Sequence, residues 1–149
     1  MANHIEFKPF EPSDRDACLQ IFDENCPLYF ATNEREDYSG FLNSFPEGYE
    51  VCMVNSHIVG AYGLAVDDQK NCHLNWILIS PGTQGSGIGN EFMTRAIARA
   101  KCLGSEEIQI SASHLSAPFF AKYGALEVNY ISDGWGLGMH RVDMRLKLP

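Results

Sequence analysis

Apolar residues recur along the 149-residue chain with two alternating periods, one of two residues and one close to 3.6. The first predicts strands and the second amphipathic helices, because side chains alternate across a strand and return to one helix face at each turn. Strands are predicted at 4–10, 49–54, 58–66, 72–80, 108–112, 126–132 and 140–148, and helices from a Ser13 cap to Pro27, after Thr32 through Leu42, at 87–103 and at 117–123.

The predicted element order is β-α-α-β-β-β-α-β-α-β-β, and no repeat, linker or low-complexity tract divides it. A chain of this length can bury one sizeable core. Its 45% hydrophobic and 20% charged residues are typical of a globular protein. The prediction is a single α/β domain with a mixed sheet over residues 1–149.

A glycine-rich segment, Gln84-Gly85-Ser86-Gly87-Ile88-Gly89, lies between a predicted strand and the longest predicted helix. Glycines let the backbone approach a ligand closely. The first amides of a helix have no partner within the helix, and the positive end of the helix dipole favours anions. This segment therefore predicts a phosphate site made by the backbone.

Three other interpretations of the segment have different requirements. A nucleoside-triphosphate loop requires a lysine and a hydroxyl after its last glycine, and here Gly89 is followed by Asn90 and Glu91. A dinucleotide site requires the spacing G-x-G-x-x-G near the start of a βαβ unit, and the spacing here is G-x-G-x-G after several strands. A plain connecting turn remains an alternative, although three glycines cost conformational entropy that such a turn has little reason to spend.

The five cysteines, Cys18, Cys26, Cys52, Cys72 and Cys102, are odd in number and form no C-x-x-C pair. They predict reduced, mostly buried thiols in a cytoplasmic protein, and no residues have metal-ligand spacing. The first residues do not resemble a signal peptide, and no apolar run approaches the roughly 20 residues of a membrane span. We expect no metal and no membrane partner.

The net charge of −8 is concentrated at one end of the chain. Residues 1–50 hold eleven acids and three bases, whereas residues 51–149 hold eight of each. The absence of a basic stripe argues against a nucleic-acid partner. An acidic surface would steer cations. The alternative is that acids such as Glu34 and Asp37 only favour helix starts and solubility.

Two segments resemble motifs of the GNAT superfamily of N-acetyltransferases. Gln84, Gly87 and Gly89 occupy the fixed positions of its pyrophosphate loop, Gln/Arg-x-x-Gly-x-Gly/Ala. The preceding residues 77–81 resemble the strand before that loop. The stretch 113–125 resembles the second motif, N-x-x-A-x-x-F-Y-x-K-x-G-F, with matches at Phe119, Lys122 and Gly124.

This resemblance implies a fold in which the two motif strands splay apart and the cofactor acetyl-CoA lies in the gap. The backbone of Ile77, Leu78 and Ile79 would pair with pantetheine. Ser113 and Phe120 would fill two further cofactor positions. The pyrophosphate would be held by the amides of Gln84, Gly85, Ser86, Gly87, Ile88 and Gly89.

The second motif also departs from the family. The tyrosine that usually acts as general acid is replaced by Phe120, which has no proton to give, and Ser113 and Ala125 stand at the asparagine and final aromatic positions. Tyr123, three residues further along, is a candidate for a displaced acid, although a tyrosine at a helix end more often serves packing. Tyr130 is a weaker alternative.

No carboxylate lies on the strand before the loop, where a base can sit. His73 and Asn75 share one face there, and His73 is a candidate to relay a proton through water. His114 follows the second motif strand and is expected near the cleft. His140 is expected to be a packed residue. The catalytic candidates are thus Tyr123, His114 and His73, each with a surface or packing role as its alternative.

The segment 133–138 holds three glycines around Trp135, which predicts a mobile lid or a contact loop of a homodimer. Its tryptophan would either line the acceptor pocket or pack onto the domain. No arrangement of serines or cysteines suggests an acyl-enzyme. We therefore expect direct transfer, in a ternary complex, from acetyl-CoA to a small or cationic amine or to a peptide. The alternative is an acyl-CoA-binding or regulatory domain with weakened catalysis.

Overall fold

The computed structural model describes residues 4–83 and 85–149. Its seven strands form one mixed sheet in the order β1-β2-β3-β4-β5-β7-β6, which confirms the predicted fold class and element order. The elements are β1 (Ile5–Pro9), α1 (Arg15–Glu24), α2 (Glu34–Asn43), β2 (Tyr49–Val54), β3 (His57–Val66), β4 (Cys72–Ile79), α3 (Ile88–Cys102), β5 (Glu107–Ser113), α4 (Ala117–Ala121), β6 (Leu126–Gly136) and β7 (Met139–Lys147), with short 3-10 helices at Pro12–Asp14 and Pro81–Thr83.

Two hydrophobic clusters lie on opposite faces of the sheet. One packs α3 and α4 against the sheet, and the other packs α1 and α2 against β2, β3 and β4. The neighbouring residues Ala61 and Tyr62 on β3 belong to different clusters, because successive side chains of a strand point to opposite faces. The helices thereby cover both sides of the strands that carry the glycine loop.

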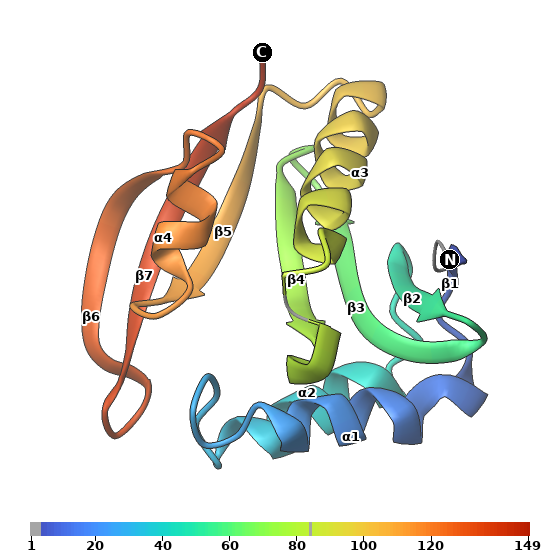
Figure 1. Cartoon of the computed structure of the whole chain (residues 1–149). Helices are drawn as coiled ribbons and strands as arrows, with labels where there is room; N and C mark the ends of the chain where they lie inside the picture. Colours follow the sequence, from blue (N-terminus) through green and yellow to red (C-terminus); the bar gives the residue numbers. More distant parts are fainter. Residues whose placement is uncertain (1–3, 84) are drawn as a thin grey trace.

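The sheet divides between β4 and β5, its one parallel pair within the described ranges. The two strands pair only over Cys72 to Leu74 on β4 and Ile108 to Ile110 on β5. Beyond these residues the two strands diverge. Figure 1 shows them close together at the top, near the C-terminus, and separating downward. On that side, the edge of β4 from residue 75 to residue 79 therefore has no neighbouring strand among the described residues.

The segment 133–138 differs from the expected loop. Strand β6 continues to Gly136 and β7 begins at Met139, so only Leu137 and Gly138 connect them. A register shift between Ile131 and Gly136, with Asp133 at a φ of 54°, lets the hairpin bulge without ending. Within the described ranges, no helix combines the length and apolar content needed to cross a membrane.

Candidate active site

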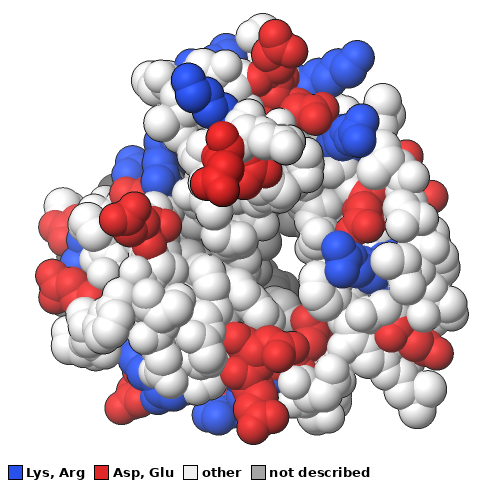
Figure 2. Space-filling view, turned by 180° about the vertical axis from the view of Figure 1, so that it is seen from behind, with Lys and Arg blue, Asp and Glu red and all other residues white. Residues whose placement is uncertain are grey.

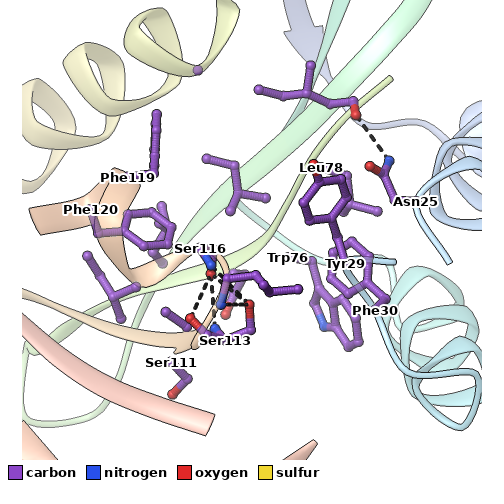
Figure 3. Close-up of a pocket in the computed structure, with 18 of the residues that line it drawn as sticks. Asn25, Tyr29, Phe30, Trp76, Leu78, Ser111, Ser113, Ser116, Phe119 and Phe120 are labelled. Atoms are coloured by element: carbon purple, nitrogen blue, oxygen red, sulfur yellow. Dashed lines mark hydrogen bonds between the residues drawn. The ribbon is translucent and has the colours of Figure 1, made fainter. Parts of the chain in front are cut away.

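A cavity of about 930 Å³ occupies the gap between β4 and β5. Residues 73–79 of β4 and 109–113 of β5 form two of its walls, and the start of α3, helix α4, the α1–α2 connection and Trp135 complete it. Figure 3 shows Ser111, Ser113, Phe119 and Phe120 on one side, and Asn25, Tyr29, Phe30 and Trp76 on the other. The cavity thus joins segments that are far apart in sequence.

The glycine loop forms one end of the cavity. Gly85 and Gly87 line it with φ values of 85° and 88°, in the left-handed region that favours glycine. Gly87 is the N-cap of α3, so the unpartnered amides of the first helical turn follow it directly. A Cβ on Gly89 would lie 3.1 Å from the Phe119 ring, which explains why a small residue stands there.

The remaining loop residues contribute backbone. Ile88 buries its side chain in the core, and the Ser86 hydroxyl donates to the Thr83 carbonyl at 2.5 Å. Neither side chain lines the cavity. The predicted contact of Gln84 lies outside the described residues.

A bulge in β4 lies at the middle of the cavity. Trp76 has a φ of 29°, and the pairing of β3 with β4 shifts register there. The buried Tyr49 hydroxyl donates to the Trp76 carbonyl at 2.6 Å and lies 2.9 Å from the Tyr38 hydroxyl. Because a trans peptide directs its N–H opposite its carbonyl, the N–H of Ile77 points away from Tyr49.

The end of β4 is fixed to helix α1. The Asn25 side-chain amide donates to the Ile79 carbonyl at 3.0 Å and to the Ile21 carbonyl at 2.8 Å (Figure 3). Ile77, Leu78 and Ile79 all line the cavity, as their predicted cofactor role requires. The strand edge is therefore held in place at its bulge and at its end.

Two aromatic residues occupy the positions considered for the general acid. Phe120 is 2% exposed, belongs to the core and lines the cavity without a proton to donate. Tyr123 also lines the cavity, and its hydroxyl donates to the Asn90 side-chain oxygen at 2.8 Å. Burial raises the pKa of Tyr123, so its hydroxyl stays protonated at neutral pH.

The histidine candidates occupy different places. His73 lines the cavity where β4 still pairs with β5, and its Nε2 lies 3.1 Å from an Asp67 carboxylate oxygen. His114 does not line the cavity. Its Nδ1 accepts the His140 backbone N–H at 3.2 Å, and the two rings lie 4.7 Å apart. The structure brings His73 and Tyr123, but not His114, to the cavity wall.

Ser113 and Ser116 hold the turn between β5 and α4. Their hydroxyl oxygens lie 3.2 Å apart, and Ser113 Oγ also accepts the backbone N–H groups of Leu115 and Ser116 (Figure 3). None of the described cavity-lining residues is a cysteine. Burial raises the pKa of the Cys18 and Cys52 thiols to about 11, so neither is an activated nucleophile.

Comparison with known proteins identifies the fold around this cavity. The model of the acetyltransferase (GNAT) family matches residues 15–125. The chain belongs to this family. Among curated proteins, no sequence matches the chain.

Solved structures with this fold span both chains almost completely. Ard1 from Thermoplasma volcanium has a TM-score of 0.81 at 13% identity, covering 97% of this chain and 98% of its own. The ribosomal-protein-S18-alanine N-acetyltransferase from Escherichia coli has a TM-score of 0.78 at 16% identity, covering 97% and 94%. An aminoglycoside 6'-N-acetyltransferase complexed with coenzyme A has a TM-score of 0.72 at 12% identity, covering 97% and 98%. At these identities the likeness concerns the fold.

Glu34 is a cavity residue of this family member that the sequence interpretation missed. It is 4% exposed, although the sequence placed it among acids that favour helix starts or solubility. Burial raises the pKa of Glu34 to about 7; a hydrogen bond from the Ala31 N–H at 2.8 Å opposes this rise, and the charge of Asp37 adds to it. A sequence signal existed, because Glu34, Tyr38 and Leu42 recur every four residues and form the buried face of α2.

Aromatic residues also line the cavity. Tyr29, Phe30 and Trp76 line it, and the centroid of Trp76 lies 6.2 Å from that of Phe30 and 4.8 Å from that of Tyr38. Figure 3 shows Tyr29, Phe30 and Trp76 grouped opposite the serines of β5 and the β5–α4 turn. This wall is apolar and electron-rich.

Trp135 connects the β6–β7 hairpin to this wall. Its indole N–H donates to the Ala112 carbonyl at 2.9 Å, and the Asn33 side chain donates to its backbone carbonyl at 2.7 Å. Trp135 lines the cavity, and the Arg141 guanidinium lies over its ring, 5.1 Å from the ring centroid. Trp135 is therefore both packed and cavity-lining, and the hairpin tip meets the α1–α2 connection.

Charge around the cavity is sparse and uneven. Among the described lining residues, Glu34 is the one carboxylate and Lys122 the one Lys or Arg side chain. Seen from behind, the surface is hollowed near its centre, with acidic side chains below the hollow, over the helices at the bottom of Figure 1 (Figure 2). In the part of the chain that the structure describes, no group of His, Cys, Asp and Glu could hold a metal ion.

Proposed function

We propose that the chain is an acetyl-CoA-dependent N-acetyltransferase. The observation that carries this proposal is the unpaired edge of β4, which leads to the glycine loop at the start of α3. An extended pantetheine arm can pair with that edge as an added strand would. The pyrophosphate oxygens of the cofactor can accept hydrogen bonds from the backbone N–H groups of the first helical turn. An aminoglycoside 6'-N-acetyltransferase with this fold was solved in complex with coenzyme A, which supports coenzyme A as the ligand.

The cofactor would be held mainly by backbone groups. Ile77, Leu78 and Ile79 would offer their peptide groups to pantetheine, and residues 85–89, together with Gln84, would surround the pyrophosphate. Ser113 and Phe120 would form the opposite wall. No sulfur ligand or metal is needed for this arrangement.

We propose direct transfer in a ternary complex. The neutral amine nitrogen attacks the thioester carbon, the C–S bond breaks, and the thiolate takes a proton. The N–H of Ile77 at the bulge is the proposed donor to the developing oxyanion, and Tyr123 the proposed donor to the thiolate. His73 would relay a proton through water. Holding both reactants in one cavity would supply much of the rate.

A second candidate is an acyl-CoA-binding domain with weakened catalysis. The observation in its favour is Phe120, which buries a ring where the family usually has a proton donor. This domain would bind acetyl-CoA by the same backbone groups. The two candidates therefore differ in turnover and agree in cofactor binding.

Two measurements separate the candidates. Calorimetric titration with acetyl-CoA measures binding, and release of free thiol measures turnover across polyamines, amino acids, aminoglycosides and peptides. Binding with amine-dependent thiol release supports the enzyme, and reactions without amine give the background hydrolysis. Binding without turnover on any amine supports the binding domain, and absence of binding contradicts both.

A further inference from the structure

Glu34 is a buried carboxylate whose second oxygen has no partner among the residues that the structure describes. One oxygen accepts the Ala31 N–H, and this is the carboxylate's sole hydrogen bond or ion pair within residues 4–83 and 85–149. No fully enclosed side-chain oxygen of these residues lacks a partner, so Oε1 of Glu34 remains accessible. Glu34 is one of the cavity-lining residues, so this accessible oxygen is a candidate contact for a ligand bound there.

Within the described part of the chain, no cation forms an ion pair with this carboxylate. Arg35, its neighbour on α2, binds Asp23 with two hydrogen bonds of 2.8 and 3.2 Å. Asp37 on the same helix and Cys26 on the α1–α2 connection are the titratable groups that interact electrostatically with Glu34. The cavity's other titratable side chains are Tyr29, His73, Lys122 and Tyr123. A buried acid without a cation is costly, and a cationic ligand would offset that cost.

The wall beside Glu34 suits an ammonium group on an apolar carrier. Phe30 and Trp76 present ring surfaces to the cavity, and cations are attracted to the faces of such rings. The acidic surface below the hollow would raise the local concentration of cations (Figure 2). A thioester on the β4 edge would lie in the same cavity as the carboxylate.

We propose that Glu34 binds the ammonium group of the acceptor and takes its proton before the amine attacks the thioester, a role that rests on the acetyltransferase activity proposed above. The proton moves from the ammonium nitrogen to a Glu34 oxygen, and the freed lone pair forms the N–C bond. As the C–S bond breaks, the nitrogen gives its second proton to water, the proposed relay at His73. The thiolate takes the proton of Tyr123, which is then replaced from water. Glu34 then returns its proton to solvent.

Burial prepares Glu34 for this role. Because burial raises the pKa of the carboxyl to about 7, Glu34 can hold a proton and release it near neutral pH. A carboxylate with an ordinary pKa would be a much weaker base towards an ammonium group. The proposed acceptors are therefore ammonium compounds with an aromatic or aliphatic carrier.

The test compares Glu34→Gln with Glu36→Gln, which changes an exposed acid on the same helix. Glutamine keeps an oxygen that can accept the Ala31 N–H, so the local turn is preserved. The probes are 2-phenylethylamine, spermidine and a dipeptide with a free N-terminus, each with acetyl-CoA. We expect Glu34→Gln to lower kcat/KM by about 100-fold or more, as loss of a general base does, with acetyl-CoA affinity unchanged.

The pH profile distinguishes a base from a structural residue. Wild type and Glu36→Gln should lose kcat/KM below an inflection near pH 7, and Glu34→Gln should lack that inflection while Glu34→Asp retains part of it. If Glu34→Gln keeps wild-type kcat/KM and the same inflection, the role of Glu34 is overturned and the acetyltransferase activity stands. If wild type releases no thiol with any amine, both proposals fail.

Discussion

The two halves of the cavity are built to bind by different means. The half at the start of α3 offers backbone amides and glycines and almost no side-chain chemistry. The half near the α1–α2 connection offers side chains, with Glu34, Phe30 and Trp76 drawn from two separate segments. Under the proposed function, the first half binds the pyrophosphate through its backbone and is called the cofactor half. The second half selects the amine through its side chains and is called the acceptor half.

Gly87→Glu changes the glycine loop of the cofactor half and should lower acetyl-CoA affinity, the largest effect that we expect. A side chain at a φ of 88° is strained, and its carboxylate would enter the anion site. We expect acetyl-CoA affinity to fall by about 100-fold or more in calorimetric titration, which is about 3 kcal/mol. Gly104→Glu is the matched control, because its φ of 76° imposes similar strain at the far end of α3. Equal losses of affinity in both variants would contradict the anion site.

Glu34→Gln should separate stability from function in the acceptor half. Because the pKa of Glu34 is raised to about 7 in the folded state, its stability contribution is complete below the ordinary pKa near 4.5 and is lost as pH rises through 7. The variant should therefore gain up to about 3 kcal/mol of unfolding free energy at pH 8 and little at pH 4.5. Urea denaturation at both pH values measures this difference.

Glu50→Gln is the opposite case and serves as the control for Glu34. Burial alone would raise the pKa of Glu50, but hydrogen bonds from Arg95, at 2.9 Å, and from Tyr62 lower it overall. Because the pKa of Glu50 is lowered in the folded state, its contribution to the unfolding free energy is present at neutral pH. That contribution is lost as the pH falls below the ordinary glutamate pKa near 4.5. Glu50→Gln should cost roughly 1–3 kcal/mol at pH 8 by leaving Arg95 with a weaker partner. A higher unfolding free energy in Glu50→Gln, or no increase in Glu34→Gln at pH 8, would contradict the opposite pKa shifts of the two carboxylates.

Tyr49→Phe would act on the bulge that separates the two halves. It removes the hydroxyl that donates to the Trp76 carbonyl, and an unpaired buried carbonyl costs about 1–3 kcal/mol. We expect lower unfolding free energy and a lower kcat, because the N–H of Ile77 depends on the orientation of the same peptide. Tyr38→Phe, which keeps that hydrogen bond, should leave kcat closer to wild type. The reverse order would show that the bulge is held by other contacts.

The sequence predicted the two halves unequally, for a physical reason. A backbone site requires glycines, so Gly85, Gly87 and Gly89 indicate the proposed cofactor half by their residue type and spacing alone. The acceptor half uses ordinary residues whose role depends on what packs around them. Glu34 begins a helix, as many solvent-exposed acids do, and only its four-residue spacing with Tyr38 marks the buried face.

The β6–β7 connection and His114 show a second limit of sequence interpretation. Three glycines around Trp135 indicated a loop, but the bulge at Asp133 keeps the hairpin paired to Gly136. Chain order placed His114 near the cleft, yet its ring accepts a backbone N–H from His140, outside the cavity lining. Alternation along a strand predicts a face, whereas the partner of a side chain depends on tertiary packing.

Tyr123→Phe should have the smallest effect, at the boundary between the halves. Its hydroxyl is held by Asn90 and stays protonated, but a thiolate is a good leaving group that needs little help from an acid. We expect kcat to fall by less than about 10-fold, below the usual contribution of a general acid, with acetyl-CoA affinity unchanged. Tyr130→Phe, which changes an exposed tyrosine on β6, is the control and should leave kcat unaltered. If Tyr130→Phe lowers kcat more than Tyr123→Phe does, the proton donor to the thiolate is Tyr130 on the hairpin. The thiolate would then lie near the hairpin and not near α4.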